Sequence, residues 1–151
     1  MPKLWRILKS ATEINLFLMP QFYEYRTHSD HRRKGAYDII PSMPGDFNFT
    51  IHNPNIIPEE IHMHKKQTDY FAVASGKVMF RLVYEDGREE KFIMTENDHK
   101  TLIIPPGIWH NYMALEPSIM VFYISHKYDL ADEFHKKTDS SEWDSSDGLK
   151  R

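Results

Sequence analysis

The sequence predicts a single all-β domain built as a sandwich or barrel. The chain has 151 residues, which is one domain's worth of sequence and long enough to bury a sizeable core. From residue 47 to residue 125, short runs rich in β-branched and aromatic residues alternate with turn signals such as Ser75-Gly76 and Pro105-Pro106-Gly107. This rhythm is typical of all-β sandwiches and barrels, and we find no sign of a second domain or an internal repeat.

The individual strands are expected from their β-branched and aromatic content. In chain order they cover residues 47–52, 60–64, 69–74, 77–84, 90–94, 101–105, 110–115 and 119–125. Gly76 is expected to let the chain turn tightly between the third and the fourth of them, because glycine tolerates backbone conformations that other residues avoid.

The segments on either side are expected to be peripheral to the barrel, which is assigned to residues 47–128. Residues 1–46 form an N-terminal segment that packs on or pairs with the barrel; within it, 1–18 fits either an amphipathic helix or a strand, and 26–45 is expected to be a polar loop. Residues 129–151 are expected to form a short helix over 129–137, with Asp129 as its N-cap, and then a polar, fraying tail. Trp143 is the one residue of this tail that argues for docking.

The expected loop carries a basic cluster, and two interpretations of it stay open. Arg26, Arg32, Arg33 and Lys34 lie close together in the chain. They fit a solvated loop, as most charge clusters do. They also fit an arm that reaches over a phosphate-bearing ligand, in this subunit or in a partner.

Composition and charge exclude several classes of function. Nineteen basic and 22 acidic residues give a formal charge of −3, so no global field attracts nucleic acid or an anionic membrane. No apolar run approaches the length that spans a bilayer, and the first residues lack the apolar core of a signal peptide, so a cytoplasmic protein is expected. The absence of cysteine rules out disulfides, thiolate metal sites and cysteine nucleophiles.

Histidines form the most informative pattern. His62 and His64 project from the same face if their segment is a strand, because side chains alternate with a period of two. Asp69 follows after a turn and could return a carboxylate to the same point. His110 begins a later strand directly after Pro105-Pro106-Gly107-Ile108-Trp109. This later segment supplies a third histidine at the start of a strand.

These two segments resemble the two motifs of the cupin superfamily. His62, His64, Asp69 and Gly76 match the first motif, with aspartate where glutamate is usual, and Pro105, Gly107 and His110 match the second. An asparagine that usually follows is replaced by Ala114. The resemblance implies an all-β, single-domain double-stranded β-helix, a jelly-roll barrel with short peripheral helices and a ligand pocket inside.

Two chemistries fit such a pocket. His62, His64, Asp69 and His110 could hold one divalent ion such as Fe, Mn, Ni, Zn or Cu, with positions left open for substrate. The same imidazoles could instead work without a metal as acids and bases near neutral pH, removing a proton next to a carbonyl.

A finer resemblance favours the metal-free chemistry. The run from His62 to Lys66, the run from Ile104 to His110 and the pair Tyr128-Asp129 resemble the nucleotide-sugar cupins, namely the dTDP-4-dehydrorhamnose 3,5-epimerases and the dTDP-4-keto-6-deoxyhexose 3,4-ketoisomerases. The resemblance implies proton abstraction next to the keto group of a dTDP-4-keto-6-deoxyhexose, leading to epimerisation or ketoisomerisation. No cofactor is then expected.

The resemblance also implies roles for single residues. His62 or His64 would be the base, Asp69 would fix its tautomer, and Tyr123 or His110 would act on the opposite face of the sugar. Substrate contacts are expected among Lys66, Gln67, Tyr70, Arg81, Arg88, Trp109 and His110. Within this set, Lys66, Arg81 and Arg88 are the candidates for the diphosphate, because charged donors suit phosphate.

Glu60 departs from both groups of relatives, which usually carry an arginine two residues before the first histidine. This departure weakens phosphate or sugar contact at that point. Two other classes therefore stay open: a metal-dependent cupin enzyme, such as a dioxygenase or sugar isomerase, and a non-catalytic sugar-binding cupin. The resemblance further implies a homodimer in which edge strands are paired or exchanged.

Overall fold

A computed structural model describes residues 7–8, 22–40 and 43–143 of the chain. Within these residues the protein is built almost entirely from strands, with three 3-10 turns (η2 to η4) and no α-helix. The strands are Ile7–Leu8 (β1), Phe22–Tyr23 (β2), Arg26–Ser29 (β3), Arg33–Tyr37 (β4), Asp46–His52 (β5), Glu60–Met63 (β6), Asp69–Ser75 (β7), Lys77–Val83 (β8), Glu89–Thr95 (β9), Leu102–Ile104 (β10), Trp109–Ala114 (β11), Ser118–Ile124 (β12) and Phe134–Lys137 (β13).

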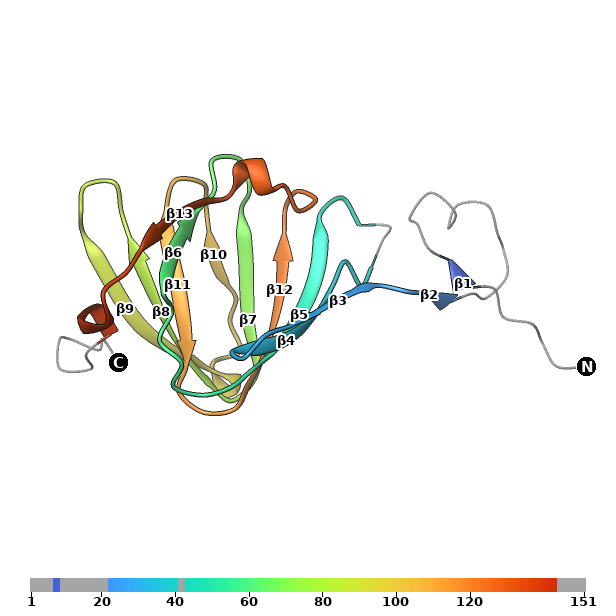
Figure 1. The fold of residues 1–151 in the computed structure, drawn as a ribbon, viewed down its shortest axis with the longest axis horizontal. Coiled ribbons are helices and arrows are strands. Elements are labelled where there is room, and N and C mark those ends of the chain that lie inside the picture. Colours follow the sequence, from blue (N-terminus) through green and yellow to red (C-terminus); the bar gives the residue numbers. More distant parts are fainter. Residues whose placement is uncertain (1–6, 9–21, 41–42, 144–151) are drawn as a thin grey trace, which may run out of the picture.

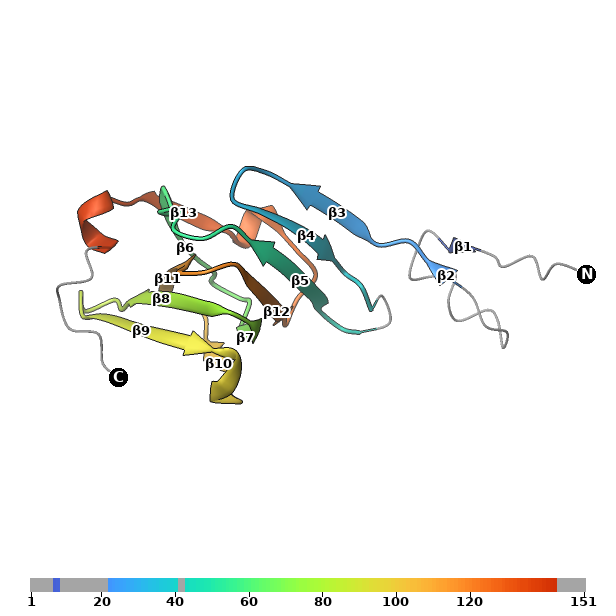
Figure 2. The same cartoon turned by 90° about the horizontal axis from the view of Figure 1, so that it is seen from below.

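Two antiparallel sheets form the walls of a barrel (Figure 1). One sheet has the order β10-β7-β12-β5-β4-β3, and the other has the order β13-β6-β11-β8-β9. Seen from below, the six-stranded sheet runs from β10 at the lower edge of the view up to β3, and the five-stranded sheet runs from β9 up to β13 (Figure 2). The expected strands from residue 47 to residue 125 are all present, which confirms the predicted all-β fold class.

The apolar core fills only part of the space between the sheets. It consists of buried side chains from β7, β8, β9, β10 and β12: Phe71, Val73, Val78, Phe80, Leu82, Met94, Ile104 and Met120. Strand β5, by contrast, turns polar side chains inward, including the buried Asn48 and Thr50. The barrel therefore has an apolar half and a polar half, and the polar half can receive a ligand.

Gly76 forms the tight turn between β7 and β8, as predicted from the sequence. Its φ is +90°, in the region that favours glycine. A Cβ atom at this position would collide with the Oγ atom of Ser118, so a side chain has no room there.

Two of the flanking predictions are wrong. The expected loop of residues 26–45 contains the hairpin of β3 and β4, because β4 pairs with β5 and extends the sheet. The expected helix of residues 129–137 is a 3-10 turn, Leu130–Asp132 (η3), followed by β13, because this segment covers the edge of β6. The expected short peripheral helices are therefore 3-10 turns within the described residues.

The docking of Trp143 is confirmed. Trp143 is 5% exposed and lies at the end of the 3-10 turn Ser140–Trp143 (η4). The expected element at residues 1–18 lies outside the described residues, apart from β1.

Candidate active site

A cluster of three histidines and one aspartate lies inside the barrel. The nearest ligand atoms of His62, His64, Asp69 and His110 all lie within 4.8 Å of one another. The pairing of β6 with β11 places His62 directly opposite His110. His64 comes just after the end of β6, and Asp69 begins β7. Both histidines of the first segment thus face the interior, and the turn after His64 brings the carboxylate back to them.

Backbone carbonyls fix the orientation of two of the imidazoles. Nδ1 of His64 lies 2.9 Å from the carbonyl oxygen of Asp132, and Nδ1 of His110 lies 3.0 Å from that of Ile108. A carbonyl can only accept a hydrogen bond, so each Nδ1 carries a proton. The Nε2 atoms are then the ones that face Asp69.

Asp69 lies between these two Nε2 atoms and is almost completely buried. Its Oδ2 atom is 2.9 Å from Nε2 of His110 and 3.6 Å from Nε2 of His64. Its Oδ1 atom accepts a hydrogen bond of 2.5 Å from the buried amide of Gln67. Since Nε2 and a carboxylate oxygen both accept hydrogen bonds, their contact at 2.9 Å requires a proton or a cation between them.

His62 differs from its neighbours because it has no hydrogen bond from its ring to any described residue. Burial, together with the charges of His110, His64, His135 and Arg33, holds the pKa of His62 well below its ordinary value. The His62 ring packs 4.2 Å from the His110 ring, centroid to centroid. His62 is therefore a neutral imidazole at physiological pH and can accept a proton.

Asp132 holds the segment that carries His64. Its carboxylate accepts hydrogen bonds from the backbone N–H groups of Lys65, Lys66 and Gln67. Burial raises the pKa of Asp132, but these three donors outweigh it and leave the pKa below its ordinary value. Asp132 is not among the predicted site residues, because no signal in the sequence separates it from the other acidic residues of its segment.

A cavity of about 400 Å³ opens beside the cluster. His62, His64, Gln67 and Asp69 line one part of it. The rest of its lining includes Arg33 and Tyr37 of β4, Phe71 of β7, Tyr112 of β11 and Phe122 of β12. The predicted site residue His110 lies behind Asp69, 2% exposed.

The predicted catalytic residue Tyr123 and several predicted substrate contacts lie elsewhere. Tyr70 and Tyr123 pack against each other on the outer face of the six-stranded sheet, with ring centroids 5.8 Å apart. The alternation of β12 explains this position, because its neighbour Phe122 faces the cavity. Trp109 also lies outside the cavity, with the Nζ atom of Lys136 3.9 Å from the centre of its ring.

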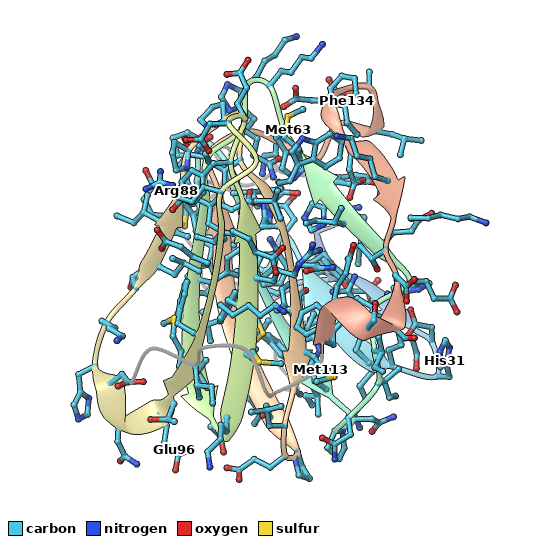
Figure 3. The ribbon with its side chains drawn as sticks, turned by 90° about the vertical axis from the view of Figure 1, so that its left-hand side faces the viewer. His31, Met63, Arg88, Glu96, Met113 and Phe134 are labelled. Carbon is cyan, nitrogen blue, oxygen red and sulfur yellow. The ribbon has the colours of Figure 1, made fainter. Side chains whose placement is uncertain are left out.

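The three predicted diphosphate ligands are not brought to the cavity either. Arg81 is buried under the C-terminal turn, where it pairs with Glu89 and Glu142 at 2.9 Å each. Arg88 lies in the β8–β9 hairpin. Figure 3 shows it far from His31, which marks the position of the β3–β4 hairpin. Lys66 is exposed and contacts Asp132 through its backbone alone.

The fold and this site define the chain as a cupin: a jelly-roll barrel with inward-facing histidines from two motif segments. The solved structures that it resembles include capsular polysaccharide assembling protein CapF from Staphylococcus aureus, at 20% identity and a TM-score of 0.68, over 77% of this chain and 35% of that one. A structure of oxalate decarboxylase from Bacillus subtilis aligns at 16% identity and a TM-score of 0.60, over 74% and 30% of the two chains. The chain thus spans about a third of the length of these proteins.

The chain belongs to the family FdtA (WxcM-like, C-terminal), whose pattern matches residues 48–142. This is a cupin family of dTDP-sugar modifying enzymes. No curated protein matches the chain. Among the described residues, no helix is long and apolar enough to cross a membrane.

Proposed function

We propose that the protein is a nucleotide-sugar isomerase, which epimerises or ketoisomerises a dTDP-4-keto-6-deoxyhexose by proton abstraction next to its keto group. One observation carries the proposal: His62, a neutral imidazole with no ring hydrogen bond to a described residue, lines a cavity of about 400 Å³. An imidazole is the side chain whose ordinary pKa best suits this step, and a neutral one with no ring hydrogen bond has a nitrogen available to accept the proton. The family of dTDP-sugar modifying enzymes supports the choice of substrate.

His62 is the proposed base. It takes the proton from the carbon next to the C4 carbonyl, and the electron pair of the broken C–H bond moves into an enediolate. Return of a proton to the opposite face of the same carbon gives the epimer. Return of a proton to C4, together with transfer of the C3 hydroxyl proton to the C4 oxygen, moves the carbonyl to C3. His64, held by Asp132 and facing Asp69, lies beside His62 with ring centroids 5.4 Å apart. It is placed to stabilise the oxyanion or to exchange a proton with it.

A tyrosine that lines the cavity is the proposed proton donor. Tyr123, the candidate from sequence, lies on the outer face of the sheet, whereas Tyr37 and Tyr112 line the cavity. Burial raises the pKa of Tyr37, while the charge of Arg33 opposes the shift, so this phenol keeps its proton at neutral pH. Tyr112 accepts a hydrogen bond of 2.6 Å from Arg33, which fixes the position of its hydroxyl at the cavity.

A metal-dependent reaction is the second candidate, because the donor set of His62, His64, Asp69 and His110 fits a divalent cation. The two Nδ1–H groups that donate to backbone carbonyls leave Nε2 free to coordinate, an arrangement typical of metal-binding histidines. A cation would also satisfy the contact between Asp69 and His110. Such an ion would supply Lewis-acid chemistry at the cavity wall.

We also propose that two copies associate through the outer face of the six-stranded sheet. The outward side chains of β5, β7, β10 and β12 are all uncharged and mostly apolar: Phe47, Phe49, Ile51, Tyr70, Ala72, Ala74, Ile103, Ile119, Val121 and Tyr123. Ile103 is 56% exposed and Ile119 38%. An apolar face of this extent supports an interface, and a two-fold dimer would cover the same patch on both copies. Analytical ultracentrifugation tests this interface. The wild type should sediment as a dimer and the Val121→Glu variant as a monomer.

The proposed activity is tested by incubating the protein with a dTDP-4-keto-6-deoxyhexose and following the sugar by NMR. Inversion at C3 or C5, or a new C3 carbonyl, is the expected result. His62→Asn should abolish the conversion, whereas His31→Asn, a change in the exposed β3–β4 turn, should leave it intact. No conversion by the wild type would contradict the proposal.

A further inference from the structure

Arg33 is a cation facing the cavity without a carboxylate partner. It lies on β4 and lines both the cavity of about 400 Å³ and a smaller cavity of about 190 Å³. Its guanidinium makes one hydrogen bond, from Nη1 to the hydroxyl of Tyr112. Its Nε atom is buried and has no hydrogen-bond partner. Four of its five N–H groups thus lack a partner among the described residues.

The other arginines of the described ranges are all neutralised, which makes Arg33 the exception. Each forms an ion pair with a carboxylate, and the pairs are Arg26 with Asp46 at 3.3 Å, Arg32 with Asp30 at 3.1 Å, Arg81 with Glu89 at 2.9 Å and Arg88 with Glu90 at 3.9 Å. No Asp or Glu among the described residues forms such a pair with Arg33. Removing a cation from water without pairing it is costly, so a largely buried guanidinium of this kind indicates an anion from outside the chain.

The surroundings of Arg33 leave its charge available to a ligand. Its neighbours are Tyr37, Tyr112, His52 and Asp30. Asp30 accepts a hydrogen bond from the backbone N–H of Arg33, but its carboxylate forms its ion pair with Arg32, at 3.1 Å. Glu60, at the position where the resembled enzymes carry an arginine, is instead paired with His135 at 3.0 Å. Positive charge for a ligand is thus supplied by the β3–β4 hairpin rather than by the segment before His62.

We infer that Arg33 binds the phosphate groups of the ligand, with the sugar lying beside His62 in the larger cavity. The guanidinium forms a bidentate contact with phosphate oxygens, a geometry for which arginine is well suited. The inference rests on the proposed function for the identity of the ligand, but not for the anion itself. It replaces Lys66, Arg81 and Arg88 as the diphosphate contacts.

Titration calorimetry with thymidine diphosphate, thymidine and inorganic pyrophosphate tests the inference. Arg33→Gln should weaken thymidine diphosphate binding by about 10- to 100-fold, the range expected for losing charge-assisted hydrogen bonds. The affinity of Arg33→Lys for thymidine diphosphate should lie between those of the wild type and Arg33→Gln, because lysine keeps the charge and loses the bidentate geometry. Thymidine, which has no phosphate, should bind Arg33→Gln and wild type equally. Arg88→Gln is the matched control, because Arg88 lies outside both cavities, and it should bind like the wild type.

The outcomes separate this inference from the proposed function. Equal binding of thymidine diphosphate by wild type and Arg33→Gln overturns the role of Arg33. If the wild type binds pyrophosphate through Arg33 but not thymidine diphosphate, the anion site stands and the proposed nucleotide-sugar substrate fails. If the wild type binds neither, the anion site is refuted. Thermal unfolding of each variant shows whether Arg33→Gln is folded. If Arg33→Gln is unfolded, the affinity of Arg33→Lys for thymidine diphosphate tests the role of Arg33 instead.

Discussion

The backbone carbonyl of Asp132 lies 2.9 Å from Nδ1 of His64, although the two residues are 68 positions apart in the chain. The Asp132 carboxylate holds the next three backbone N–H groups after His64. One residue of the C-terminal segment therefore fixes both the tautomer of a site histidine and the path of the loop that carries it.

Asp132→Asn should destabilise the fold and loosen His64. An amide offers one oxygen to three N–H donors and points its own donors at them, so we expect a loss of about 1–3 kcal/mol in the free energy of unfolding. Denaturant titration measures this loss. The imidazole ¹⁵N shifts of His64 should also move from a fixed Nδ1–H tautomer towards a mixture. Asp129→Asn, an exposed N-cap on the same turn, is the control and should leave these shifts unchanged.

The two tyrosines that line the cavity, Tyr37 and Tyr112, should differ from the outward-facing Tyr123 in their effect on kcat. We expect Tyr37→Phe or Tyr112→Phe to lower kcat by about 100-fold or more, since general acid catalysis contributes on this scale. Tyr123→Phe should leave kcat unchanged, because its hydroxyl lies on the other face of the sheet. Steady-state kinetics of the three variants measures these effects. A large loss in Tyr123→Phe alone would place the donor where the sequence predicted it.

Stability should fall in mild acid because His52 is buried in its neutral form. Burial, followed by the charges of Arg33 and Arg32, lowers the pKa of His52 to about 4. Between the ordinary value of 6.5 and this value, the unfolded chain binds a proton that the folded chain does not. Stability is therefore lost as pH falls through this window, by an amount on the order of 3 kcal/mol.

The His52→Gln variant should flatten this dependence, since glutamine does not titrate. Urea denaturation at several pH values between about 4 and 7 gives the slope of the free energy of unfolding against pH. This range covers roughly the window between the folded and the ordinary pKa of His52. His31→Gln, on the exposed turn, should keep the slope of the wild type. Identical slopes in wild type and His52→Gln would show that His52 is not buried in its neutral form.

Metal content separates the two candidate reactions. We expect only trace Fe, Mn, Ni, Zn or Cu in protein purified without a histidine tag and without added chelator, and activity that survives chelator treatment. Elemental analysis gives the number of metal ions per protein chain. A ratio near one ion per chain, lost in His64→Ala, would show that His62, His64, Asp69 and His110 act as ligands. The metal-dependent reaction would then replace the proposed one.

The central part of the fold could be predicted because the local sequence of each strand is sufficient to indicate a β-strand. The alternation of β7 and β8, the turn at Gly76 and the same-face pair of His62 and His64 are all local properties of the sequence. The hairpin of β3 and β4 could not be predicted in this way. Its residues are polar, and they become strands only because β4 pairs with β5.

Part of the cavity lining depends on the same long-range pairing. Arg33 and Tyr37 reach the site because β4 lies next to β5. Asp132 reaches it because the C-terminal segment returns along the edge of β6. The resemblance to nucleotide-sugar cupins suggested Tyr123, but whether a residue faces in or out depends on the register of β12, and this register turns Tyr123 outward.

Solvent deuterium exchange into a 4-keto sugar nucleotide tests the proposed chemistry most directly. In D₂O the wild type should incorporate deuterium at a carbon next to the keto group, followed as the loss of that proton signal by NMR. His62→Ala and His64→Ala should each abolish the uptake, and Arg88→Gln should not. Uptake that persists in both histidine variants would contradict the account, because the proton would then be removed by a group other than these imidazoles.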